Sequence, residues 1–311
     1  MSDSMVVGTR GSRLALIQTE SIVSRIENIF PELEVKIEII QTAGDKVSSA
    51  PFKSVGASGI FVREIEKALA ERKIDIAVHS LKDLQTDLHP DLIIGAITER
   101  ESACDVLISR HNKTFENLPS GAVIGTSSTR RKALIAIERP DIVARECRGN
   151  IPTRLAKLDS GEFDAIIVAE AGIARLGLTA RITERLDFNR FIPAVGQGAI
   201  GVEIRRNDNR VLDIVRQLNH EPTYAACMEE RAFLRQTGGG CHVPVGAFMR
   251  YENNQAIFSS FISTCDGKWF AREQIAASAD NSGGLGEKMA ERMRSHPGFD
   301  AFLREVAQDA D

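Results

Sequence analysis

The chain has 311 residues, of which 43% are hydrophobic and 26% charged, and its formal net charge is −4 at pH 7. This length predicts two or three domains, because single cores stop growing at about 250–300 residues. The acidic balance argues against a nucleic-acid-binding protein, which usually carries excess basic charge, and no apolar run approaches the roughly 20 residues that cross a membrane.

From the N-terminus, the chain alternates strand and helix patterns. The first residues lack the basic region and apolar core of a signal peptide, so we expect a cytoplasmic protein. Apolar runs and helical spacing then predict a strand at 5–9, a helix at 13–30, a strand at 34–40, a helix at 60–71 and a strand at 74–79. This order is typical of an α/β domain.

A second set of elements repeats the alternation, and the order changes after residue 221. We predict strands at 122–125, 142–146, 165–169 and 200–204, with helices from 129 and at 153–158. Beyond them follow a helix at 223–235, strands near 245–250, 255–263 and 269–276, and further helices to the end. The last part therefore reads as an α+β domain.

The stretch from 41 to 59 shows neither a strand nor a helix pattern, because it is rich in Gly and Ser and its apolar residues have little periodicity. Unstructured connections longer than about 12–15 residues often serve as lids or binding loops. A tolerated surface insertion explains the same composition equally well. Both interpretations stay open at this point.

Basic and hydroxyl side chains are concentrated in the predicted turns that lead from a strand into the next helix. These turns are at 9–12, 79–83, 125–131 and 148–154. Ligands of open α/β sheets bind beyond the carboxyl ends of the strands, where helix N-termini offer free N–H groups. Arginine adds a planar guanidinium group, which binds a carboxylate through two charge-assisted hydrogen bonds. Any one of these basic residues could be a surface charge, but four such loops in an acidic chain predict a cleft for an anion with several carboxylates.

Asp83 is the one acid within these loops. Next to Lys82 it could form a plain ion pair. A lone acid among cations also suits a reaction that expels an amine, because it can donate a proton and then stabilise the remaining cation. His79, at the end of an apolar strand, is interpreted as a hydrogen-bonded core histidine.

Cys241 follows three glycines and precedes Pro244 by three positions. Such a glycine run is either a flexible hinge or room for a bulky group carried by the thiol. The other four cysteines are scattered without a C-x-x-C pair, so we expect neither a disulfide scaffold nor a metal site, and we interpret them as buried apolar fillers or incidental thiols. These are Cys104, Cys147, Cys227 and Cys265.

Seven short motifs occur in an order that closely resembles the porphobilinogen deaminase (hydroxymethylbilane synthase) family. They are His-Ser-Leu-Lys-Asp at 79–83, Gly-Thr-Ser-Ser at 125–128, Arg-Arg at 130–131, Arg-Gly-Asn at 148–150, Thr-Arg-Leu at 153–155, Pro-Ala-Val-Gly-Gln-Gly at 193–198 and Gly-Gly-Cys at 239–241. Each motif alone is weak, but their ordered combination is specific. The resemblance extends from about Val6 to Cys241, with a looser tail.

The resemblance implies a transferase of tetrapyrrole biosynthesis. Four porphobilinogen molecules condense head to tail with loss of ammonia, and water releases linear hydroxymethylbilane. It also implies a dipyrromethane cofactor bound through a thioether to Cys241, and Asp83 as the residue that hydrogen-bonds pyrrole N–H groups and assists amine loss through an azafulvene-like cation. It implies a monomer with no nucleic-acid or membrane partner.

The same match assigns the remaining site residues. Cofactor contacts fall on Ser12, Lys82, Asp83, Thr126, Ser127, Ser128, Arg130, Arg131, Arg148 and Gly149. Substrate contacts fall on Arg10, Ser12, Phe61, Arg148, Arg154, Arg175 and Gln197, although Phe61 at helical spacing with Ile65 also reads as a core residue.

The implied fold has three domains. Two are doubly wound α/β domains similar to type-II periplasmic binding proteins, at 1–99 plus 196–218 and at 100–195. The third, at 219–311, is a small α+β domain that carries the cysteine loop. The strand at 200–204 is thus expected to return to the first domain.

The sequence departs from the family pattern at a few positions. Ser54 and Ser58 stand where many relatives have lysines, so we expect Lys53 to contribute less to ligand binding than Arg10 or Arg131. Arg13 and Gln85 replace common prolines, and His242 replaces a common glutamine; these changes leave the implied chemistry intact.

Two other functions stay open from the residues alone. A solute-binding module would use the first two domains as a clamp for a carboxylate ligand. A cysteine-dependent hydrolase or acyltransferase would need a base beside Cys241, and His242, as its direct neighbour in sequence, seldom gives that geometry.

Overall fold

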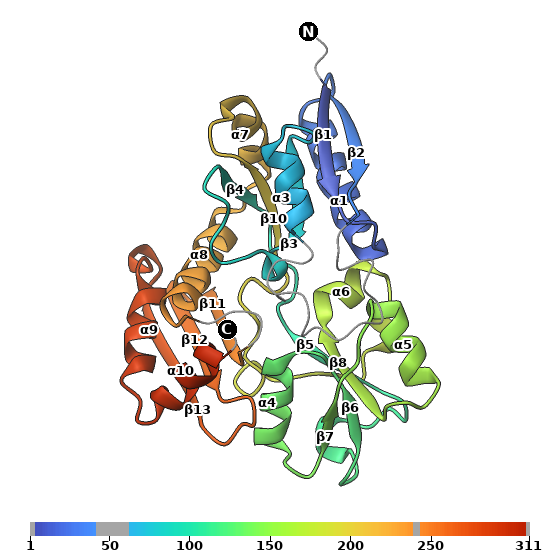
Figure 1. The fold of residues 1–311 in the computed structure, drawn as a ribbon, viewed down its shortest axis with the longest axis vertical. Coiled ribbons are helices and arrows are strands. Elements are labelled where there is room, and N and C mark those ends of the chain that lie inside the picture. The colour runs from blue at the N-terminus through green and yellow to red at the C-terminus, as the bar shows by residue number, and fades with distance from the viewer. Residues whose placement is uncertain (1–3, 42–61, 239–242, 309–311) are drawn as a thin grey trace. The chain divides into compact units, whose positions relative to one another are not determined.

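The computed structural model of the chain describes residues 4–41, 62–238 and 243–308 (Figure 1). The chain divides into two compact units, each made of two segments. The first unit comprises 1–101 and 198–224, and the second comprises 102–197 and 225–311. The two units are described one after the other.

The first unit is built on a five-stranded mixed sheet. Its strand order is β2 (Glu34–Ile39), β1 (Ser4–Thr9), β3 (Ile76–Ser80), β10 (Ile200–Arg205) and β4 (Leu92–Ile97). β1 runs parallel to β2 and β3, whereas β10 runs antiparallel to both β3 and β4. The prediction that the strand near residues 200–204 returns to the first domain is therefore confirmed.

Helices cover this sheet with their apolar stripes. α1 (Arg13–Ile29) buries Ile22 and Ile26 in one cluster with Met5 of β1. α3 (Arg63–Ala70) packs against β1, β3 and β10 through Ile65 and Leu69. α7 (Asn209–Val215) packs against β4 and β10. Two short 3-10 turns, η2 (Leu81–Asp83) and η5 (Arg216–Leu218), complete the described part of the unit.

The second unit contains a five-stranded sheet and a three-stranded sheet. The larger sheet has the order β7 (Val143–Arg145), β6 (Val123–Gly125), β8 (Ala165–Ala169), β5 (Asp105–Ser109) and β9 (Glu184–Arg185). β6 pairs in parallel with β7 and β8, and β5 pairs antiparallel with β8. The helices of this part are α4 (Thr129–Glu138), α5 (Ile151–Asp159) and α6 (Glu170–Arg175).

The smaller sheet is an antiparallel meander of β11 (Val245–Glu252), β12 (Gln255–Ser263) and β13 (Phe270–Ser278). It shares an apolar core with α8 (Glu221–Gln236), α9 (Leu285–Arg294) and α10 (Phe299–Gln308), in which Phe233 and Phe258 are fully buried. Glu229 of α8 accepts the N–H groups of Gly284 and Gly286 and so caps the start of α9. This is the predicted α+β arrangement.

The α/β fold class with a small α+β C-terminal part is confirmed by these elements. Strands β8 and β12 have the predicted bounds. Most ends of the other predicted elements differ from the observed ends by one to three residues. Five strands and α-helices of the described ranges were not assigned from the sequence: β4, β5, β9, α6 and α7. The second and third predicted domains lie in one compact unit, so the three-domain division stays a prediction, and the loop interpretation for 41–59 concerns residues outside the described ranges.

Candidate active site

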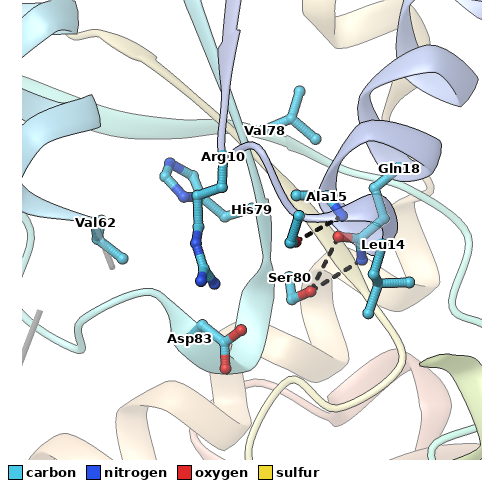
Figure 2. A pocket seen from close by; sticks show the side chains of 10 residues that line it. Arg10, Leu14, Ala15, Gln18, Val62, Val78, His79, Ser80 and Asp83 are labelled. Atoms are coloured by element: carbon cyan, nitrogen blue, oxygen red, sulfur yellow. Dashed lines mark hydrogen bonds between the residues drawn. The ribbon is translucent and has the colours of Figure 1, made fainter. Parts of the chain in front are cut away.

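A pocket in the first unit collects residues from three loop regions (Figure 2). Arg10 and Ser12 lie between β1 and α1, Gln18 lies on α1, and His79 and Ser80 end β3. Asp83 of η2 also lines this pocket. Because β1 and β3 are parallel, their carboxyl ends meet at one sheet edge, and the pocket forms there.

The start of α1 is fixed by hydrogen bonds that the sequence supplies locally. Ser12 is the N-cap, and its Oγ accepts the N–H of Ala15 at 3.3 Å. One turn later, Gln18 donates from Nε2 to Ser80 Oγ at 2.9 Å, and Ser80 Oγ donates back to Gln18 Oε1 at 3.1 Å. This reciprocal pair joins the first helix to the end of β3.

Asp83 is held at the pocket by its buried neighbour. Leu81 is 1% exposed, and its N–H donates to the carbonyl of Ala199 at 3.0 Å. Gly201 leaves room for Leu81, since a Cβ on that glycine would lie 2.9 Å from Leu81 Cδ1. With Leu81 anchored, the Asp83 side chain is exposed, and Figure 2 shows the side chain of Arg10 extending toward it.

His79 is buried, with its Nε2 3.2 Å from Oε2 of Glu203 on β10. The prediction of a hydrogen-bonded core histidine is confirmed. Its partner was not identified from the sequence.

In the second unit, the predicted hydroxyl residues organise the turn from β6 into α4. Ser128 is the N-cap of α4, and its Oγ accepts the N–H of Arg131 at 3.4 Å. Thr126 is fully buried, and its Oγ1 accepts the N–H of Ser128 at 3.3 Å. Ser127 Oγ donates to the carbonyl of Cys147 at 2.7 Å and thereby joins this turn to the loop before α5.

Arg130 and Arg131 converge on a carboxylate that the sequence analysis missed. Asp105 accepts from Arg130 Nη2 at 2.8 Å and from Arg131 Nη2 at 2.6 Å. Gln197 Nε2 donates to Asp105 Oδ1 at 2.8 Å, and Gln197 Oε1 accepts from Arg131 at 3.4 Å. Asp105 begins β5 opposite Ala169 at the end of β8, which puts it at the sheet edge where α4 starts.

This cluster carries more positive than negative charge. Burial alone would raise the pKa of Asp105, but the attraction of Arg130 and Arg131 leaves it well below its usual range. Asp105 is therefore ionised, and two guanidinium groups face one carboxylate. This excess positive charge favours an anion nearby. The Nε atoms of both arginines are buried without a hydrogen-bond partner. Whether Arg130 and Arg131 hold ligand carboxylates stays a prediction.

The loop before α5 emerges at the same edge of the second sheet, because β6 and β7 are parallel. Arg148 Nε donates to Glu146 Oε1 at 2.9 Å, and Arg154 Nε donates to the carbonyl of Gly149 at 2.8 Å. Gly149 has φ +112, which favours glycine. Asn150 caps α5 by accepting the N–H of Thr153 at 3.0 Å.

The predicted site residues thus fall into two sets. Arg10, Ser12, Lys82 and Asp83 belong to the first unit; Arg175, in the last turn of α6, belongs to the second with the residues above. Cys241 and Phe61 lie outside the described residues. So do Lys53, Ser54, Ser58 and His242.

Asp105 and Glu203 were missed because each lies far in sequence from the residues it contacts. A signal was present in both cases, because each acid directly precedes or interrupts a run of apolar strand residues. Within the described ranges, no three or more His, Cys, Asp or Glu side chains are grouped as metal ligands. Nor does any described helix have the length and apolar character needed to cross a membrane.

Comparisons with known proteins match nearly the whole chain. Residues 5–213 match the family model described as "Porphobilinogen deaminase, dipyromethane cofactor binding domain", and residues 224–295 match "Porphobilinogen deaminase, C-terminal domain". Among solved structures, the methionine-binding protein MetQ aligns with 74% of this chain and 94% of its own, at 12% identity and a TM-score of 0.46.

Curated relatives agree with the family models. The porphobilinogen deaminase of Desulforudis audaxviator is 44% identical over 94% of this chain and 95% of its own. That of Synechococcus sp. (strain RCC307) is 43% identical over 99% of this chain and 98% of its own. The chain therefore belongs to the porphobilinogen deaminase family, enzymes that carry a dipyrromethane cofactor and polymerise porphobilinogen into hydroxymethylbilane in tetrapyrrole biosynthesis.

Proposed function

We propose that amine loss from porphobilinogen takes place at Asp83, in the pocket that this residue shares with Arg10 and Ser12. The supporting observation is the pocket itself, in which the side chain of Arg10 extends toward a single exposed carboxyl group (Figure 2). Arg10 and Ser12 bind a carboxylate of the substrate, and Lys82 adds positive charge from the adjacent position. This arrangement holds the aminomethyl arm near Asp83.

Asp83 then acts as general acid and electrostatic stabiliser. It donates its proton to the amino nitrogen while the carbon–nitrogen bond breaks, so that ammonia leaves with the bonding electron pair. The resulting carboxylate stabilises the positive charge on the substrate carbon. That carbon forms a bond to a second pyrrole ring, which loses a ring proton to Asp83 and restores the acid.

The anion-binding residues of the second unit fit the acidic cofactor of this family. Two guanidinium groups share one carboxylate there, and their Nε atoms are buried without partners. We assign the cofactor carboxylates to the α4 and α5 N-terminal turns, and substrate carboxylates to Arg154 and Arg175. Gln197 instead supports this cluster from within, because its Nε2 donates to the carbonyl of Ala103 at 2.6 Å and to Asp105 at 2.8 Å. The cofactor-binding residues in these turns are Thr126, Ser127, Ser128, Arg130, Arg131, Arg148 and Gly149.

Two further assignments depend on the sequence alone. Cys241 is the attachment point of the dipyrromethane, which supplies the pyrrole end to which the first substrate is joined, and Phe61 lies against a pyrrole ring. We also propose that the protein acts in the cytoplasm as a monomer.

The test of Asp83 is the isosteric variant Asp83→Asn, which keeps the size of the side chain and removes its proton transfer. We expect kcat to fall by about 10²–10⁴-fold, the usual contribution of a positioned acid, with little change in thermal stability. The matched control is Asp91→Asn, an exposed carboxyl group of the same unit, which should keep wild-type kcat. Wild-type turnover by Asp83→Asn would remove this residue from the mechanism.

A further inference from the structure

Three titratable side chains lie buried together behind the pocket of the first unit. His79 of β3 contacts Glu203 of β10 at 3.2 Å between Nε2 and Oε2. Glu203 is opposite Ala77 in the strand register, and His79 is two residues further on, so both side chains are on one face of the sheet. Glu66 reaches the same face from α3, which packs against both strands.

These three side chains are buried, and two of them have a carboxyl oxygen without a hydrogen-bond partner. Glu203 is 0%, His79 6% and Glu66 9% exposed. Oε1 of Glu66 and Oε1 of Glu203 are both buried without a hydrogen-bond partner. Glu203 contacts the imidazole of His79, and Glu66 is a second buried carboxyl group on the helix that packs against both strands. Charging both carboxyl groups is unfavourable, because like charges repel in a low dielectric.

The surroundings of Glu66 favour its protonated form. Burial and the charge of Glu203 raise its pKa, while His79, His89 in the loop before β4 and Arg63 on its own helix act in the opposite direction. The net direction is upward. The protonated form of Glu66 thus persists to higher pH in the folded protein than in the unfolded chain.

His79 connects these carboxyl groups to the pocket. Its side chain lines the same pocket as Arg10 and Asp83 (Figure 2), while its Nε2 faces Glu203. A change of charge behind His79 therefore acts across one imidazole ring on the groups proposed to bind the substrate. Between Glu66, His79 and Glu203 this effect is weakly screened, because these three side chains are buried.

We propose that Glu66, His79 and Glu203 form a proton-sharing triad that sets the charge of the pocket wall facing Arg10 and Asp83. Glu203 is a positioning residue: it accepts the Nε2–H of His79 and fixes the ring. Glu66 is the proton store: its ionisation adds a negative charge behind the wall and weakens binding of substrate carboxylates. This role rests on the proposed function of the Asp83 pocket.

The kinetic test compares KM and kcat from pH 4.5 to 9 in the wild type, Glu66→Gln and the control Glu71→Gln. Glu71 ends the same helix as an exposed residue paired with Lys73 at 2.7 Å. We expect KM of the wild type and of the control to rise with pH. In Glu66→Gln, which mimics the protonated acid, the rise in KM should be lost and kcat at pH 7 should stay within about threefold. Parallel KM profiles in all three proteins would overturn the proposal.

Glu203→Gln tests the positioning role, because its amide still fills the site but lacks the charge that orients His79. We expect kcat/KM to fall about tenfold and the pH profile of KM to differ in shape from the wild type. An unchanged profile with only a lower melting temperature would show a purely structural residue and would contradict the positioning role.

A second readout does not depend on turnover. The ring signals of His79 in isotope-labelled protein, assigned by comparison with His79→Gln, should show a titration step from Glu66 that vanishes in Glu66→Gln. Identical NMR titration curves for both proteins would disprove the triad even if Asp83 is catalytic. Conversely, active Asp83→Asn with an intact NMR step would refute the proposed function and leave proton sharing standing.

Discussion

Asp105 and Glu66 are both buried carboxyl groups, but their surroundings shift their pKa values in opposite directions. Asp105 receives two guanidinium groups and an amide, so its charged form is stabilised. Glu66 has a second carboxyl group as its main electrostatic neighbour. The surroundings of a buried carboxyl group therefore favour its charged form in one unit and its protonated form in the other.

Asp105→Asn should strongly destabilise the second unit, because it leaves Arg130 and Arg131 buried without a counter-charge. Removing one partner of a buried ion pair costs about 3–5 kcal/mol, to be measured at pH 7 by urea unfolding. The depressed pKa of Asp105 contributes stability above the unfolded value of about 3.9. This contribution is lost as pH falls toward the folded pKa, so the difference between the two proteins should shrink in acid.

The control for this prediction is Asp141→Asn. Asp141 is an exposed carboxylate that accepts from Arg139 at 2.8 Å, so its loss should change stability little. Equal effects of the two substitutions would show that the buried Asp105 cluster contributes no more than a surface ion pair.

Among single residues, the sequence predicted those that stand next to other basic or hydroxyl groups in the chain. Asp83 and Ser128 were selected as candidates this way, because motif neighbours mark them. Asp105 lies 25 residues before Arg130 in the chain, and Glu203 lies 124 residues after His79. Contacts of that separation depend on which strands become neighbours, which local spacing does not reveal.

At the level of elements, strand ends and helix starts explain how the site residues are positioned. Ser12, Ser128 and Asn150 each cap a helix directly after a parallel strand. Ser12 and Ser128 stand directly before the predicted helix starts at 13 and 129, as helix start signals do, whereas the helix after Asn150 begins two residues before the predicted start at 153. The antiparallel strands β5 and β10 were harder to place. A five- or six-residue apolar run gives a strand but not its direction or its neighbours.

Gly149→Ala tests the turn that leads into α5. Alanine at φ +112 is strained, and its Cβ would lie 2.8 Å from Cβ of Thr153. The control is Gly177→Ala, where φ is +70 but no atom lies within 4 Å of the added Cβ. We expect a loss of about 1–2 kcal/mol for the control and a larger loss for Gly149→Ala by urea unfolding. Equal losses would show that the Thr153 contact imposes no constraint.

For the whole molecule, each unit presents the carboxyl ends of parallel strands with cations and helix N-termini beside them. The fold class and the family were accessible from the sequence, because seven motifs keep a fixed order along the chain. Membership of the family sets aside both alternatives left open by the residues, the solute-binding module and the cysteine-dependent hydrolase.

The most direct test of a covalently held pyrrole chain is the intact mass of freshly purified protein. We predict a species heavier than the 34.1 kDa polypeptide by two linked pyrroles, and an unmodified polypeptide for Cys241→Ser. A wild-type protein of unmodified mass that porphobilinogen never alters would contradict the assignment of Cys241 as the cofactor anchor.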